Sequence, residues 1–361
     1  MKIHPEVPYN DLPLLPPKAE LETQSVLKKA ITANRALSEL NSLGNSIPNQ
    51  AILISAISLQ EAKASSEIEN IITTNDTLYR AITAKKNNVD GATKEVIRYR
   101  EALWEGFSNL KQKSVITGSM LIRIVQIIKQ NEAGIRNLPG TIIKNFATNK
   151  ILYTPPVGEQ VILELLKNLE KYINQDNGAD TLIKMAVIHY QFEAIHPFFD
   201  GNGRTGRILN TLYLVKQGLL DLPILYLSRY INLHKAKYYQ LLHNVSFKNE
   251  WEPWVLFMLE ATEETAIYTK TKIRNIRQLY EDTLAQGKRD LPPRVFSPEL
   301  IEVIFSQPYT KIETLVKANI AKRKTAAEYL KELEKLGILK SEKAGKEMLY
   351  LNIKLYEILA Q

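Results

Sequence analysis

The segment His196-Pro-Phe-Phe-Asp-Gly-Asn-Gly-Arg-Thr-Gly-Arg207 concentrates several chemical groups in 12 residues. It holds one imidazole, one carboxylate, one amide, two guanidinium groups and three glycines. Helical spacing of apolar residues on both sides predicts one helix over about 179–194 and another from the motif to about Gln217. We therefore expect the segment to form a loop that carries polar groups between two helices, within a helical fold.

The glycines and arginines of this segment indicate an anion site. Gly201 and Gly203 allow backbone N–H groups to approach an anion closely, and the helix that starts near Gly203 favours negative charge at its N-terminus. Arg204 and Arg207 are three residues apart, so they lie on one helix face and can hold neighbouring phosphates.

The remaining polar groups fit a reaction on such an anion. Asp200 offers the hard oxygen ligand that Mg²⁺ prefers, with phosphate oxygens as further ligands. His196 has an ordinary pKa suited to taking a proton from an attacking hydroxyl near pH 7. The residues alone therefore predict phosphoryl or nucleotidyl transfer. His189, on the preceding helix, is interpreted as a packing residue.

The segment also resembles the motif of the Fic family, His-x-Phe-x-(Asp/Glu)-Gly-Asn-Gly-Arg-x-x-Arg, at every specified position. The resemblance spans about residues 5–280. It is carried outside the motif by four shorter stretches, Tyr9-Asn-Asp-Leu-Pro-Leu-Leu-Pro-Pro17, Tyr153-Thr-Pro-Pro156, Leu225-Tyr-Leu-Ser228 and Tyr238-Tyr239.

The resemblance implies a protein adenylyltransferase that moves AMP from Mg²⁺-bound ATP to a Tyr, Ser or Thr hydroxyl of a target protein or of itself. It implies that His196 deprotonates that hydroxyl and that Phe198 anchors the loop in the core. The other implied roles belong to ligands of the nucleotide. They are Asp200 for Mg²⁺, Gly201, Asn202 and Gly203 for phosphate, Arg204 for the α/β region and Arg207 for the γ-phosphate.

A second motif lies earlier in the chain. Ser65-Ser-Glu-Ile-Glu-Asn70 resembles the inhibitory motif (Ser/Thr)-x-x-x-Glu-(Gly/Asn) of the same family. The resemblance implies that Glu69 pairs with Arg207, so that Arg207 cannot place the γ-phosphate. Ser65 is one helical turn before Glu69 and is expected to form hydrogen bonds close to it.

The rest of the chain predicts a mainly α fold with three parts. Residues 1–110 would hold a proline-rich arm and a helical region with the inhibitory helix, and 111–285 the catalytic core. Residues 290–361 would form a winged-helix-like domain after a linker near 286–294. Glycines, prolines and short β-type runs around 134–158 predict a hairpin. Within it, Arg136–Thr154 resembles the flap on which Fic proteins dock a target segment.

The tail leaves two functions open. Lys322, Arg323 and Lys324 begin its third predicted helix, where DNA-reading side chains would lie. However, 291–361 carries 12 lysine and arginine residues against nine acidic ones, a mild excess for a DNA-binding domain. Winged helices also dock proteins.

Composition sets broader limits. The chain has no cysteine, which excludes disulfides and cysteine-based zinc sites. No apolar run of about 18 residues is present, so we expect no membrane partner, and cytoplasm is the expected compartment. The formal charge of +8 is compatible with phosphate-rich partners or with an ordinary lysine-rich surface.

Two alternatives stay open besides adenylyl transfer. One is a DNA-binding regulator whose Fic core only senses nucleotide. The other is a Fic enzyme that removes AMP or transfers another phosphate-containing group. A homodimer is compatible with all three.

Overall fold

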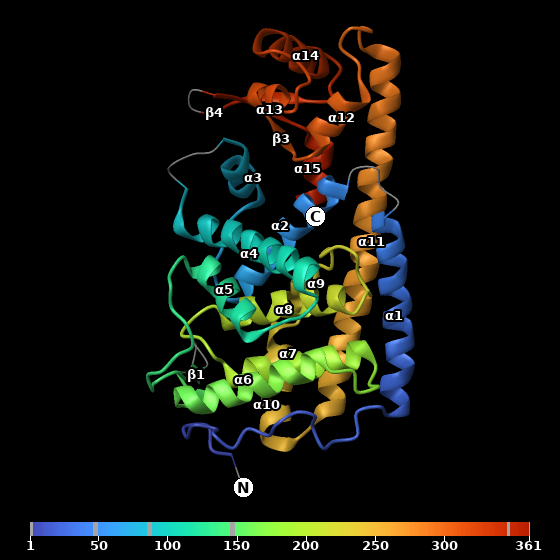
Figure 1. Ribbon diagram of the computed structural model, residues 1–361. Coiled ribbons are helices and arrows are strands. Elements are labelled where there is room, and N and C mark those ends of the chain that lie inside the picture. The colour runs from blue at the N-terminus through green and yellow to red at the C-terminus, as the bar shows by residue number, and fades with distance from the viewer. Residues whose placement is uncertain (1–2, 46–49, 85–88, 145–148, 345–346, 361) are drawn as a thin grey trace.

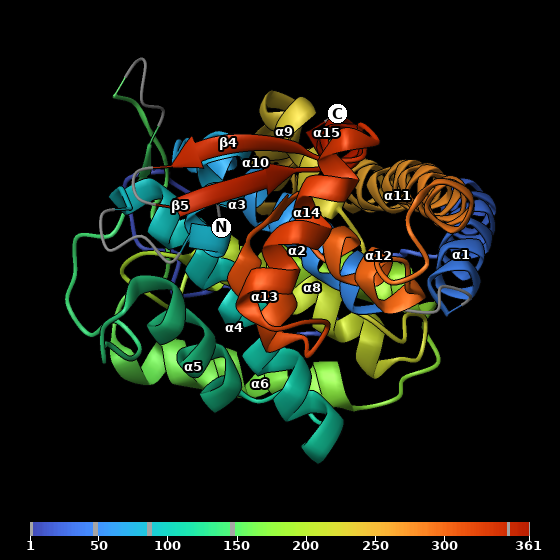
Figure 2. The same cartoon turned by 90° about the horizontal axis from the view of Figure 1, so that it is seen from above.

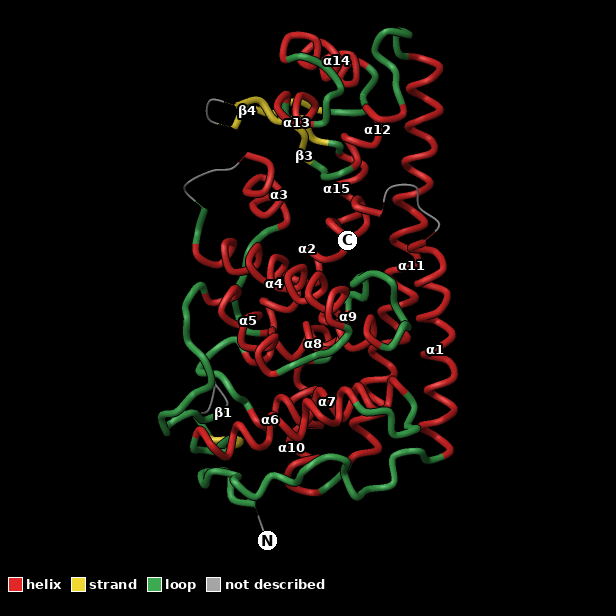
Figure 3. Tube along the Cα trace, viewed as in Figure 1, coloured by secondary structure: helices red, strands yellow, loops and turns green. Residues whose placement is uncertain are grey.

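The computed structural model describes residues 3–45, 50–84, 89–144, 149–344 and 347–360. Helices make up most of these residues, and strands occur only in two small sheets (Figures 1 and 3). The predicted mainly α class is therefore confirmed. No helix in the described ranges combines the length and the apolar character needed to cross a membrane.

The helices of the N-terminal half and of the motif region closely follow the sequence pattern. Their bounds are α1 Gln24–Asn45, α2 Gln50–Ile68, α3 Asn75–Ala84, α4 Gly91–Lys113, α5 Gly118–Lys129, α6 Glu159–Asn174, α7 Thr181–Ile195 and α8 Asn202–Lys216. The C-terminal helices are α9 Leu227–Leu233, α10 Lys235–Lys248, α11 Trp251–Asp290, α12 Pro298–Phe305, α13 Ile312–Lys317, α14 Arg323–Lys335 and α15 Ile353–Ala360.

Helices α7 and α8 form the centre of the body. Almost every residue of α7 is buried, as expected for a helix that is apolar on all sides. Asp180 caps its N-terminus by accepting hydrogen bonds from the backbone N–H groups of Leu182 and Ile183. Helix α8 packs against α7, α4, α5 and α2, so the start of α8 is surrounded by helices from distant parts of the chain.

The linker predicted at 286–294 was partly wrong, because helix α11 continues to Asp290. Gly287 and the nearby charges suggested a chain break, but Gly287 lies inside the helix. A Cβ there would meet Phe296 at 3.3 Å, so the glycine permits close packing. Helix α11 runs beside α1 in the body and continues beside the C-terminal helices (Figures 1 and 2). The division into three parts stays a prediction, but its boundaries near 110 and 285 fall within α4 and α11.

The proline-rich arm lies along the body, as predicted. The backbone N–H of Tyr9 donates to the Thr154 carbonyl at 3.0 Å, and that of Leu15 donates to Asn168 Oδ1 at 2.8 Å. Leu12 and Leu15 are buried. The arm thus covers the edge of the body where α6 and the exit of the hairpin lie.

The predicted hairpin is present as a short antiparallel pair. Strand β1 spans Ile143–Lys144 and strand β2 spans Ile151–Tyr153, with Ile143 opposite Tyr153. Residues 145–148, within the predicted Arg136–Thr154 flap, lie outside the described residues.

The C-terminal region contains helices α12, α13 and α14, followed by strands β4 at Lys340–Ala344 and β5 at Glu347–Leu351. The sequence pattern predicts strands at Ile338–Lys340 and Met348–Leu351, so the first strand begins two residues later than expected. It also contains strand β3 at Tyr309–Thr310, which pairs with β5, and helix α15; neither was predicted. Helix α14 begins with Lys322–Lys324 exposed. A winged helix and its binding to DNA stay predictions.

Candidate active site

The motif loop joins α7 to α8 through two residues in the left-handed region. His196 has a φ of 49° and its N–H donates to the Phe192 carbonyl, which ends α7. Gly201 has a φ of 80° and precedes α8. For His196 this backbone conformation carries strain, which surrounding contacts must offset.

Phe198 and Asn202 supply such contacts. Phe198 is buried and lies beside Phe192, so it anchors the loop as expected. Asn202 Oδ1 accepts from the Phe198 N–H at 2.8 Å, and Asn202 Nδ2 donates to the Phe198 carbonyl at 2.7 Å. The Asn202 side chain therefore closes the loop, which leaves its backbone N–H to face an anion.

Arg136 is a further support that the sequence did not indicate. Its buried guanidinium donates to the backbone carbonyls of His196 at 2.7 Å and Ile195 at 3.2 Å. The backbone N–H of Arg136 donates to the Pro197 carbonyl at 2.9 Å. The chain between α5 and β1 is thereby tied to the catalytic loop.

The imidazole of His196 is in an environment that keeps it neutral. Burial and the positive charge of Arg136 lower its pKa to about 4, against weaker opposing effects of the Glu193 backbone and Asp200. Its Nδ1 is buried and has no hydrogen-bond partner in the described part of the chain. At pH 7 the ring is thus available as a proton acceptor.

The start of α8, which follows this ring in the motif, carries backbone N–H groups without helical partners. The N–H groups of Asn202, Gly203 and Arg204 lie in its first turn, where the helix has no acceptors for them. A Cβ on Gly203 would lie 2.6 Å from Glu69 Oε1 and 2.8 Å from Arg207 Nη1. A side chain at position 203 would therefore displace the Glu69 carboxylate or the Arg207 guanidinium from its present place.

That carboxylate, Glu69, bridges both motif arginines. Its Oε1 accepts from Arg207 Nη2 at 2.8 Å, which is the expected pair, and its Oε2 accepts from Arg204 Nε at 2.8 Å, which was not expected. Both guanidinium groups are almost fully buried, whereas Glu69 retains 22% side-chain exposure. Glu69 thus lies at the helix terminus as a phosphate would.

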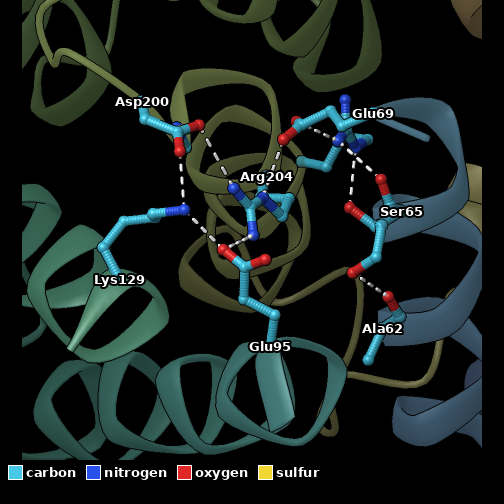
Figure 4. A network of polar contacts seen from close by, with 10 residues as sticks. Ala62, Ser65, Glu69, Glu95, Lys129, Asp200 and Arg204 are labelled. Carbon is cyan, nitrogen blue, oxygen red and sulfur yellow. Dashed lines mark hydrogen bonds and ion pairs between the residues drawn. The ribbon is translucent and has the colours of Figure 1, made fainter. Parts of the chain in front are cut away.

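Ser65 completes the arrangement around Arg207. Its hydroxyl accepts from Arg207 Nε at 2.7 Å and its carbonyl accepts from Arg207 Nη2 at 2.9 Å. Ser65 therefore contacts the arginine that Glu69 contacts, as its spacing suggested. Ser65 lies in the last turn of α2, and Glu69 lies just after the end of that helix, four residues further on (Figure 4).

Asp200 belongs to a network of ion pairs that includes two residues the sequence did not indicate, Lys129 and Glu95. Lys129 at the end of α5 reaches Asp200 at 2.6 Å and Glu95 at 2.5 Å (Figure 4). Glu95, on α4, also lies 3.0 Å from Arg204 Nη1, and Asp200 lies 3.3 Å from Arg204 Nη2. Burial raises the pKa of Asp200, but Lys129 and Arg204 outweigh it, so the net shift is downward.

Two more buried carboxyl groups lie near these residues. Glu61 on α2 accepts from the Ser228 N–H at 2.9 Å, from the Ser228 hydroxyl and from Tyr99, and burial raises its pKa. Glu193 on α7 has a pKa raised to about 7, chiefly by burial. Neither position carried a motif signal.

His189 lies in the core as a packing residue, as interpreted. It stacks on Trp254, and its Nε2 bonds with the Tyr238 hydroxyl at 2.9 Å. Burial lowers its pKa to about 3, so it is neutral.

Comparison with known proteins agrees with this geometry. Residues 27–108 match the Fic/DOC family N-terminal domain and residues 116–214 match the Fic/DOC family domain. Residues 279–355 match the C-terminal domain described as protein adenylyltransferase SoFic-like. The fold and the loop thus define a protein with a Fic-type site, and the chain belongs to the Fic/DOC family.

Curated relatives share shorter stretches. Protein adenylyltransferase fic-1 of Caenorhabditis elegans is 30% identical over 112 residues, which are 30% of this chain and 20% of that protein. A probable protein adenylyltransferase of Aquifex aeolicus (strain VF5) is 36% identical over 80 residues, 22% of this chain and 25% of that protein. The matched stretches thus span a fifth to a quarter of the length of these relatives.

Solved structures share the fold. A Fic family protein from Desulfovibrio desulfuricans G20 aligns with a TM-score of 0.59 and 19% identity, covering 93% of this chain and 98% of that one. Fic-1 from C. elegans aligns with a TM-score of 0.54 and 20% identity, covering 69% and 74%.

Proposed function

We propose that this chain is a protein adenylyltransferase that transfers AMP from ATP to a hydroxyl of a target protein or of itself, and that Glu69 holds it in a resting state. The observation that carries the proposal is the Glu69 carboxylate bound to both Arg204 and Arg207 at the start of α8, beside the neutral His196. A triphosphate would need the same arginines and the same helix terminus.

The reaction follows from these positions. The target hydroxyl oxygen attacks the α-phosphorus of ATP while His196 accepts the hydroxyl proton. A bond forms between that oxygen and the α-phosphorus, and the bond from the α-phosphorus to the bridging oxygen breaks, so that pyrophosphate leaves. Arg204, Arg207 and the first N–H groups of α8 balance the phosphate charge. Positioning and charge balance supply most of the acceleration.

Asp200 would hold Mg²⁺ in this reaction. Its side chain is 58% exposed, and it is the motif carboxylate that faces the start of α8. No group of three potential metal-binding side chains occurs among the described residues, which fits a metal whose other ligands are phosphate and water. When bound, Mg²⁺ would neutralise charge on the polyphosphate.

Glu69 would act as the brake by occupying Arg207. While Arg207 holds Glu69 and Ser65, it cannot also hold a γ-phosphate. Separating a buried charged pair costs up to about 3–5 kcal/mol. Partial exposure of Glu69 reduces that cost, and a gap of about 2–3 kcal/mol would leave roughly 1–3% of molecules open. The resting protein would therefore be slow but not inert.

The test is mass spectrometry after incubation with ATP and Mg²⁺. We expect Glu69→Gly to acquire the mass of AMP on a Tyr, Ser or Thr at least about tenfold faster than the unmodified sequence. Glu67→Gly, on the same turn of α2 but paired with Lys63, is the matched control and should stay slow. Glu69→Gly with His196→Ala should lose the modification.

Other outcomes separate the alternatives. A folded Glu69→Gly protein without any added AMP argues against adenylyl transfer. If the His196→Ala protein keeps nucleotide-dependent DNA binding, the core is a sensor. If only the protein with Glu69 intact strips AMP from a modified substrate, the site removes AMP.

A further inference from the structure

Lys129 is a positive charge at the motif loop that no motif contains. We propose that Lys129 is a polyphosphate-binding residue, held by Asp200 and Glu95 in the resting protein and released to a phosphate oxygen when ATP binds. This inference rests on the proposed nucleotidyl transfer and adds a third cation to its site.

The position of Lys129 is set by packing as well as by charge. Its stem lies against the motif turn, since a Cβ on Gly201 would lie 3.7 Å from both Lys129 Cγ and Cδ. Val125, one turn earlier on α5, contacts the same point at 3.1 Å. Helix α5 therefore delivers the ammonium group to the loop that precedes the anion-binding terminus of α8 (Figure 4).

Charge balance explains why Lys129 is needed. The resting cluster has three cations, Lys129, Arg204 and Arg207. It has three carboxylates, Glu69, Glu95 and Asp200. When Glu69 leaves, the cluster gains one net positive charge, which favours a polyphosphate. Without Lys129 the open cluster would only be neutral.

The ammonium group of Lys129 is paired with two carboxylates, Asp200 at 2.6 Å and Glu95 at 2.5 Å. Glu95 anchors Lys129 on one side and Arg204 on the other, so Asp200 is the contact that can be exchanged. Asp200 is also the more exposed partner, at 58% against 18% for Glu95.

The test measures binding of ATP without metal, because phosphate must then be balanced by protein cations alone. Calorimetric titration in the presence of a chelator would compare Glu69→Gly with Glu69→Gly/Lys129→Met. Methionine keeps the unbranched stem and removes the charge. We expect the Kd of Glu69→Gly/Lys129→Met for ATP to be at least about tenfold higher than that of Glu69→Gly, the parent. Lys129→Arg in the same background should bring the Kd back to within about threefold of the parent value.

Lys113→Met in the same background is the matched control. Lys113 is exposed at the end of α4, about 27 Å along that helix from Glu95, and its loss should change Kd less than about twofold. An equally small change for Lys129→Met in a folded protein overturns the inference. The inference is also overturned if Glu69→Gly/Lys129→Met binds Mg²⁺-ATP more tightly than Glu69→Gly does, because Lys129 would then compete with the metal. If the parent itself does not bind ATP, the proposed function fails with it.

Discussion

His196 shows how one residue depends on its surroundings for its chemistry. Its backbone is in the left-handed region, its ring is neutral because of burial and Arg136, and its carbonyl is held by the same arginine. The motif supplies the imidazole, but the neighbouring chain segments set its protonation state and its position. A histidine with an ordinary pKa near 6.5 would be partly charged in many cells.

The lowered pKa predicts the acid side of the pH profile. The neutral ring is the active base, and it becomes protonated only as pH falls through about 4. In Glu69→Gly, auto-modification rates should therefore change less than about twofold between pH 7 and 5.5. An ordinary histidine would lose about tenfold over that range.

Glu193 needs a control in that experiment, because its pKa of about 7 lies within the range tested. Repeating the profile with Glu193→Gln removes that titration and keeps the side-chain shape. A tenfold fall by pH 5.5 in both proteins, with near-ultraviolet spectra unchanged, would contradict the assignment of a neutral His196.

At the scale of elements, α2 is the helix whose C-terminal end meets the motif arginines. Ser65 in its last turn and Glu69 just after its end contact these arginines, and Glu61, two turns before Glu69, is buried against α9. Glu61 satisfies one of the free N–H groups at the start of α9, that of Ser228, and also accepts from the Ser228 hydroxyl. The Glu61 contact thus joins α2 to the segment that follows the motif.

Glu61→Ala should therefore weaken both stability and the brake. It leaves the Ser228 N–H and the Tyr99 hydroxyl without a buried acceptor, which we expect to lower the free energy of unfolding by about 2–4 kcal/mol. Denaturant unfolding measures the loss. Without denaturant, the rate of auto-modification of Glu61→Ala should be higher than that of the unmodified sequence, because α2 is held less firmly.

Glu67→Ala is the comparison on the same helix. Glu67 is partly exposed and pairs with Lys63 at 2.5 Å. Its replacement should therefore lower the free energy of unfolding by less than about 1 kcal/mol. Equal losses for the two variants would show that Glu61 has no special part in holding α2.

At the scale of the whole molecule, the C-terminal region is packed against α3, the helix that follows α2 in the chain. Arg80 of α3 contacts Asp76, Glu342 of β4 and the ring of Tyr309. The Tyr309 hydroxyl in turn donates to Asp76. Helix α3 follows α2 directly in the chain, and Figure 1 shows it lying between α4 and the C-terminal region.

Arg80→Met should loosen this contact locally. Loss of two ion pairs and a cation–π contact should lower the local stability of α3 by about 1–2 kcal/mol. Hydrogen exchange at Asn75–Ala84 and at Tyr309–Thr310 should then become faster by about tenfold. Arg277→Met, which removes only an exposed pair with Glu281, should leave these segments unchanged. Unchanged exchange in Arg80→Met would show that α3 is held by other contacts.

The sequence by itself determined what is local. Residues His196–Arg207 are contiguous, so their helix–loop–helix setting was predicted from the spacing of apolar residues around them. The pair between Glu69 and Arg207 was also predicted, because each residue lies in a recognisable motif. Helix types and the short hairpin followed from periodicity and turn residues.

Only the tertiary structure decided which distant residues surround that loop. Lys129, Glu95 and Arg136 come from 60 to 109 positions before the motif residues they contact, and Glu69 reaches a second arginine 135 positions away. Helix α11 likewise continues through Gly287, where the absent side chain leaves room for Phe296. Such contacts depend on how helices are placed against one another, and single charged residues on amphipathic helices carry no local signal of that placement.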